Sequence, residues 1–214
     1  MKLFKGLMPL GMISAVVYFI HVFLGQWLWK EYNPLTMDIS SLTAVGAPNA
    51  DLLRIFTMIY GLCFLLFAAG MMVKAFREYH WLTKTGYTIF LSMALASVVG
   101  YSLFPLSGDK TVMSFQNMMH IIVTVIVVFT TIFSFYFIAF GYLRQEKLKS
   151  LGAICLSAAV LITAFGVFNP ISMAMELNIL GLTERLVIFT LQVFVFFLSF
   201  IYTFNHKLLS AKDK

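Results

Sequence analysis

Six long apolar runs, separated by short polar segments, dominate the pattern of this chain. They cover residues 7–29, 51–73, 85–105, 116–142, 151–169 and 182–204. A helix needs about 20 mostly apolar residues to cross a bilayer. Strands of a membrane barrel would be shorter and would alternate apolar with polar residues. The pattern therefore predicts an all-α, polytopic membrane protein, with six transmembrane helices in one domain spanning residues 1–214.

Composition agrees with this interpretation. Of 214 residues, 61% are hydrophobic and 11% are charged, which is too apolar for a soluble core of this size. The first run is longer than a signal-peptide core and no small-residue cleavage site follows it, so we interpret it as an uncleaved anchor. Cys63 and Cys155 both fall inside predicted helices, which indicates packing rather than a disulfide or zinc site.

Charge is sorted between the two sides of the predicted helices. Eleven of the 15 Lys and Arg residues lie on one side: Lys2, Lys5, Lys74, Arg77, Lys84, Arg144, Lys147, Lys149, Lys207, Lys212 and Lys214. Most acids lie on the other side. The positive-inside rule then places both termini in the cytoplasm. We interpret the net charge of +6 as a topology signal, so the expected partners are membrane lipids and not nucleic acid.

Three prolines mark the outer boundary. Pro34, Pro105 and Pro170 are each followed by an aliphatic and then a hydroxyl residue, near the points where outgoing helices should end. Proline cannot continue the hydrogen-bond ladder of a helix, so each is expected to stop one. The recurrence also suggests three helical hairpins built on one plan.

Small residues predict which helices lie in the bundle interior. Ser92, Ala96 and Gly100 recur every four residues in the third run, and Ala153 and Ser157 do so in the fifth. Such spacing lets helix backbones approach closely in lipid. We therefore expect the third and fifth helices to be the most interior.

The longest connector, residues 30–50, is expected on the outer side. It contains Asp38 and Ser40, and Asn49 precedes the second run as a candidate helix cap. A long loop on a compact bundle is often a lid or a binding loop. The alternative is that its polar residues serve only turns and caps.

Ionisable residues within the predicted helices all lie toward this same side. They are His21, Arg54, His120, Glu184 and Arg185. Ionisable groups in a membrane helix are costly, and they usually face the bundle interior or water. Their position predicts a polar pocket open to the outside that binds or handles a small amphiphile or lipid headgroup. Together with Asp38 and Ser40, these side chains would form the site, with His21 as its floor. A purely structural polar network is the main alternative.

The same residues are also compatible with other functions. His21, His120 and a carboxylate from Asp38 or Glu184 are the ligand types of a hydrolytic zinc centre, which would make the protein a metal-dependent intramembrane hydrolase. No HExxH pair supports that arrangement, and no GxSxG elbow or nucleotide-binding loop is present. The two histidines could also bind haem. A small-molecule transporter and a partner-binding membrane protein complete the alternatives, and we predict no cofactor. The oligomeric state is left open.

Several motifs resemble a known family. They are Asp38-Ile39-Ser40-x-Leu42, Gly46-Ala47-Pro48-Asn49-Ala50, Phe104-Pro105, His120 and Gly181-Leu182-Thr183-Glu184-Arg185. Together they resemble the prokaryotic six-span membrane family catalogued as domain of unknown function 998. The resemblance covers nearly the whole chain and implies a six-helix bundle in a bacterial or archaeal plasma membrane. It implies no particular activity.

Overall fold

The computed structural model describes residues 6–108 and 114–205. Six long helices account for most of them: α2 (Leu10–Leu28), α3 (Ala50–Glu78), α4 (Trp81–Leu103), α5 (Phe115–Leu143), α6 (Lys149–Ala174) and α7 (Leu180–Phe204). All six are long and apolar enough to cross a membrane. Two short 3-10 helices, η1 (Ile39–Thr43) and η2 (Glu146–Leu148), lie in connectors. The predicted all-α fold with six membrane helices is confirmed.

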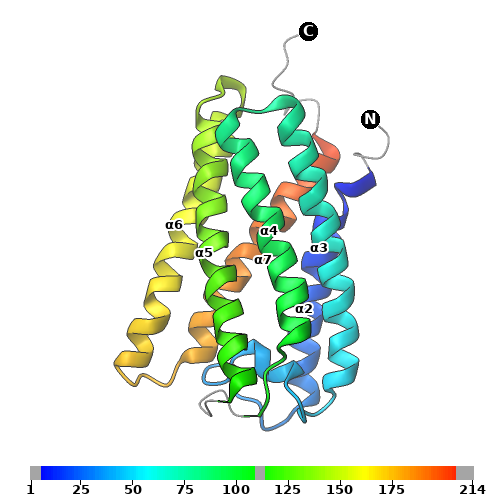
Figure 1. Ribbon diagram of the computed structural model, residues 1–214, viewed down its shortest axis with the longest axis vertical. Helices are drawn as coiled ribbons and strands as arrows, with labels where there is room; N and C mark the ends of the chain where they lie inside the picture. The colour runs from blue at the N-terminus through cyan, green and yellow to red at the C-terminus, as the bar shows by residue number, and fades with distance from the viewer. Residues whose placement is uncertain (1–5, 109–113, 206–214) are drawn as a thin grey trace.

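The helices form a closed ring of antiparallel neighbours (Figure 1). Each packs against the next in sequence, and α2 packs against α7 to close the ring. The start of α2 and the end of α7 therefore lie at one end, which we call the terminal end. The opposite end carries the long connector, residues 29–49, and we call it the loop end. The charge pattern predicts that the loop end faces outward.

Two helix boundaries differ from those expected. The second apolar run was expected to end at residue 73, but Lys74 and Arg77 lie inside α3, and the turn before α4 is only Tyr79 and His80. Pro170 does not end its helix, because α6 continues to Ala174. The φ angle of proline is compatible with a helix, so α6 continues past Pro170 despite the lost N–H.

The expectation that the third and fifth helices are the most interior is wrong. Within an apolar stretch of 18 residues in each helix, 39% of the residues of α2 and of α7 are buried. The share is 28% in α4 and 33% in α6. Ser92, Ala153 and Ser157 are exposed. The hydroxyl of Ser157 donates to the carbonyl of Ala153 at 3.1 Å, so it has a partner even on a lipid-facing surface. Only Gly100 acts as expected: a Cβ there would lie 2.6 Å from Val123.

The connector at the loop end packs onto the bundle. Within it, η1 contacts α2, α3 and α7. The amide of Val45 donates to the carbonyl of Leu106 at 2.8 Å, and the amide of Leu182 donates to that of Leu35 at 3.0 Å. Gly181 permits this approach, because a Cβ there would lie 2.3 Å from the carbonyl oxygen of Met37. The connector is thus fixed over the ends of the helices that carry the candidate residues.

Candidate functional site

Arg185 ties the connector to α7. Its Nη1 donates to the carbonyl oxygens of Met37 at 3.0 Å and Gly181 at 2.8 Å, and its Nη2 donates to the Tyr32 hydroxyl at 2.6 Å. Arg185 is only 7% exposed. Charge-assisted hydrogen bonds of this kind are about twice as strong as neutral ones. The guanidinium therefore holds the connector in place rather than projecting into an open pocket.

The two carboxylates of the predicted site also contact the connector backbone. Glu184 accepts a hydrogen bond from the amide of Ile39 at 2.6 Å. Asp38 caps η1, with its Oδ1 accepting from the amide of Ser41 at 3.1 Å and from the Ser41 hydroxyl. Asp38 and Glu184 thus both bond to backbone amides at the start of η1, Asp38 from within the connector and Glu184 from α7.

Tyr32 completes this junction. Its hydroxyl donates to the carbonyl of Asp38 at 2.7 Å and accepts from Arg185. Burial raises the pKa of Tyr32 to about 12, although the Arg185 guanidinium opposes that rise. The hydroxyl therefore stays protonated at physiological pH and keeps its donor role.

Arg54 and Ser40 lie at the edge of the connector. Arg54 donates from Nε and Nη2 to the carbonyl of Thr43, at 3.3 and 3.1 Å, and pairs with Asp51 at 3.0 Å. The side chain of Asp51 is 97% exposed, so this ion pair is a surface pair of small energetic value. Ser40 is half-buried, and its carbonyl accepts from the Thr43 hydroxyl at 3.4 Å. Both residues help to shape the loop.

His120 belongs to a different contact, between α5 and the end of α4. Its Nδ1 lies 2.8 Å from the carbonyl oxygen of Phe104, and its ring lies 5.0 Å from that of Tyr101. One turn earlier on α5, Asn117 bonds both backbone groups of Ser107. His120 therefore helps to anchor the segment that follows α4.

His21 lies deeper, in a cluster that we call the deep polar cluster: Tyr18, His21, Tyr60 and Gln192. The ring of Tyr18 lies 5.7 Å from that of His21 and 4.8 Å from that of Tyr60. Gln192 donates from Nε2 to the Tyr60 hydroxyl at 3.0 Å. His21 is 2% exposed and Gln192 is fully buried. Three helices, α2, α3 and α7, thus bring these polar groups together inside the bundle.

The deep polar cluster holds polar atoms without a protein partner. Among the residues described, neither ring nitrogen of His21 has a hydrogen bond, nor does Oε1 of Gln192. Outside the cluster, Nε of Arg185 is also unpaired. Leaving a buried donor or acceptor unpaired costs about 1–3 kcal/mol. Tyr18 also packs in one buried group with Tyr32 and Ile39, which links this cluster to the connector above it.

Sequence reasoning found His21 but missed its neighbours. Gln192 was detectable, because a lone amide inside an apolar membrane segment is itself a candidate for function. Tyr18, Tyr32 and Tyr60 gave no comparable signal, since aromatic residues are common in such helices. Their importance depends on which face of each helix turns inward.

The ligand set suggested for a metal does not assemble. In the described part of the chain, no three His, Cys, Asp or Glu side chains are grouped closely enough to hold a metal ion. His120 bonds the segment after α4, whereas Glu184 bonds η1. The metal-dependent hydrolase therefore lacks the donor arrangement that it requires.

Comparison with known families matches residues 12–201 to a family described as protein of unknown function, DUF998. The chain belongs to this family. The matched segment contains every predicted site residue and the whole deep polar cluster. No curated protein and no solved structure matches the chain. The resemblance drawn from the sequence motifs is thus confirmed, and the DUF998 chain is a multi-pass membrane protein.

A second polar cluster of this DUF998 protein lies at the terminal end. Four tyrosine hydroxyls form a chain, with Tyr79 to Tyr202 at 2.8 Å, Tyr202 to Tyr142 at 2.5 Å and Tyr142 to Tyr87 at 2.7 Å. Lys74 lies beside it, with Nζ 5.4 Å from the ring centre of Tyr79. We call these four residues the tyrosine chain. It was not predicted.

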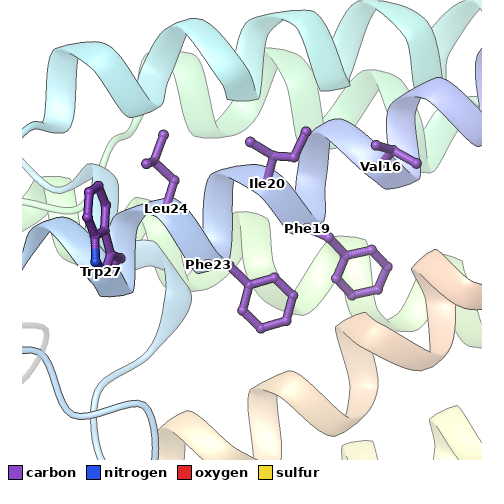
Figure 2. Close-up of a pocket in the computed structure, with 6 residues that line it drawn as sticks. All are labelled: Val16, Phe19, Ile20, Phe23, Leu24 and Trp27. Atoms are coloured by element: carbon purple, nitrogen blue, oxygen red, sulfur yellow. The ribbon is translucent and has the colours of Figure 1, made fainter.

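Two surface depressions of the DUF998 protein lie away from the predicted site. One, of about 510 Å³, is a shallow apolar groove along α2. Figure 2 shows Phe19 and Phe23 pointing to one side of that helix and Ile20 and Leu24 to the other. The second, of about 310 Å³, is formed by Ser172, Met173, Glu176, Asn178, Ile179 and Leu180. None of the seven predicted residues lines either depression.

Proposed function

We propose that this protein binds a small amphiphile or lipid in the loop-end half of its bundle, with residues 29–49 as a cover. The observation that carries the proposal is the deep polar cluster. His21 and Gln192 present unpaired donors and acceptors directly below a connector that is fixed mainly by side chain to backbone bonds. Buried polar atoms need partners, and a bound polar group would supply them.

Apolar residues beside the cluster support an amphiphilic ligand. Val22, Leu42 and Leu53 form a buried group with Tyr18 and Tyr32 in the same part of the bundle. A ligand with a polar end and an apolar body would meet both surfaces, which is typical of small-molecule sites. We also propose a prokaryotic plasma membrane as the location, with the loop end outward, on the basis of the charge pattern and the family resemblance.

The competing function is a structural or partner-binding role. It is favoured by the fact that Arg54, Glu184 and Arg185 all bond to the connector backbone and could serve stability alone. A transporter has less support, because α2 to α7 run without a break through the bundle. The two leading functions differ in whether the deep polar cluster retains a ligand.

Native mass spectrometry of the protein extracted in mild detergent would test the proposal. We expect the wild-type chain to carry one bound amphiphile, and His21→Leu to lose it because its ring nitrogens no longer offer partners. Gln145→Leu is the control, since Gln145 accepts a bond from the amide of His80 at the terminal end. The bare chain mass in both the wild type and the control would contradict the proposal and favour the structural role.

A further inference from the structure

The hydrogen-bonding capacity of the deep polar cluster restricts the ligand. A neutral imidazole offers one donor and one acceptor, and the carbonyl oxygen of an amide offers an acceptor. Both nitrogens of His21 and Oε1 of Gln192 lack partners among the described residues. A hydroxyl both donates and accepts. It could therefore accept from the N–H of His21 while donating to Gln192.

The charges near the cluster disfavour an ionic ligand. Tyr18, His21, Tyr60 and Gln192 bring no fixed charge of their own. The nearest charged groups, Glu184 and Arg185, are of opposite sign, and each is bonded to the connector. An ion placed in the cluster would therefore lack a dedicated counter-charge, and burying an unpaired charge is far more costly than burying a hydroxyl.

Depth points to the same class of ligand. His21 lies seven residues from Leu28, the loop-end terminus of α2, which is about 10 Å along the helix. Gln192 lies 12 residues from the start of α7, or about 18 Å. These positions fall within the thickness of the bilayer hydrocarbon, where charged groups are heavily penalised.

We infer that the ligand is a neutral amphiphile whose hydroxyl group bonds to the unpaired polar atoms of the deep polar cluster. This inference rests on the proposed function and names its substrate class: alcohols and glycerides with a free hydroxyl, rather than carboxylates, amines or phospholipids. The apolar body of the ligand would contact the buried group formed by Val22, Leu42 and Leu53.

A series of probes with the same oleoyl or oleyl chain would test the inference. The neutral members are 1-monooleoylglycerol and oleyl alcohol, and the charged members are oleate, oleylamine and oleoyl-lysophosphatidylcholine. Binding is measured from the concentration dependence of the unfolding midpoint in a neutral detergent. Effects of a probe on the micelle act equally on all variants, so the difference between wild type and variant is the signal.

We expect the two neutral probes to raise the midpoint of the wild type and of Gln145→Leu. Gln192→Leu should weaken their binding about tenfold, because one hydrogen bond to the hydroxyl is lost. His21→Leu, which alters the other side of the proposed contact, should do the same. Both replacements remove unpaired polar atoms, so the folded protein should tolerate them.

Two outcomes would separate the inference from the proposal beneath it. Binding of oleate, oleylamine or the lysophospholipid with the same dependence on His21 and Gln192 would overturn the neutral-ligand inference and leave a ligand site in place. If no probe distinguishes the wild type from the two variants, the neutral-ligand inference fails. If no amphiphile is retained on purification either, the proposed function fails with it.

Discussion

The two polar clusters of this protein differ in how completely their members satisfy one another. In the tyrosine chain each hydroxyl bonds to the next, and four hydroxyls link α4, α5 and α7 to the end of α3. In the deep polar cluster His21 and Gln192 keep unpaired atoms among the described residues. A fully satisfied network rigidifies a core, whereas an incomplete one is expensive unless something else completes it. The contrast is consistent with the proposal that the loop end binds a ligand and the terminal end has a structural role.

Lys74 sharpens the contrast. It is 5% exposed and pairs with Glu78 at 2.7 Å, and its ammonium lies over the rings of Tyr79 and Tyr202. This buried charge at the terminal end thus has both a carboxylate and aromatic faces. At the loop end, the buried guanidinium of Arg185 donates to the carbonyls of Met37 and Gly181 and to the hydroxyl of Tyr32. Both buried charges therefore have partners, although among the described residues Nε of Arg185 and, near the terminal end, Oγ1 of Thr83 have none.

The largest effect is expected from Arg185→Met. The change removes three hydrogen bonds made by a buried guanidinium, so the carbonyls of Met37 and Gly181 and the hydroxyl of Tyr32 each lose one donor. We expect a loss of about 3–5 kcal/mol, because each hydrogen bond to a charged group contributes about 1.5–3 kcal/mol. Thermal unfolding would report it, and cleavage by trypsin after the exposed Lys30 should become faster as the connector loosens.

Arg54→Met is the matched control for that change. Arg54 also bonds to the connector, but its side chain is 40% exposed, so water can replace its contacts and the loss should stay below about 1 kcal/mol. Equal losses for the two arginines would show that the connector is not held chiefly by Arg185.

An intermediate effect is expected from Tyr142→Phe, which interrupts the tyrosine chain at its middle. Tyr142 lies between Tyr87 and Tyr202, so the hydroxyl of each neighbour loses a bond inside the core. The expected loss is about 1–3 kcal/mol, seen as a lower midpoint with no change in ligand binding. Tyr136→Phe is the control, since its hydroxyl takes part only in a 3.4 Å contact from Thr163. A binding defect in Tyr142→Phe would break the division of roles between the two ends.

The sequence predicted the fold far better than the contacts. Six apolar runs of sufficient length determine six helices, because lipid leaves the backbone no other partner than itself. The site was predicted only by depth: His21 and Arg185 stood out because charged or titratable groups are rare in membrane helices. Gln192 carries the same kind of signal and was overlooked.

What could not be predicted is which faces meet. The contact between Tyr60 and Gln192 joins two residues 132 positions apart in the sequence. It depends on how α3 and α7 are rotated about their axes within the ring of helices. The connector was equally ambiguous. Its polar residues suggested ligand contacts, yet Asp38 caps η1 and Arg54 bonds a backbone carbonyl, which are roles that the surrounding fold decides.

The smallest effect on stability, and the most informative in sign, is expected from Gln192→Leu. The substitution removes the hydrogen bond from Gln192 to Tyr60, but it also removes a buried oxygen that has no partner. The two contributions to stability therefore nearly cancel. We expect the free energy of unfolding of ligand-free protein to change by less than about 1 kcal/mol, or to rise. The free energy of unfolding of Tyr142→Phe should be clearly lower than that of Gln192→Leu. If Gln192→Leu proves as destabilising as Tyr142→Phe, the amide is a structural member of a satisfied network. The distinction between the two clusters would then disappear, because both ends of the bundle would be held together in the same way.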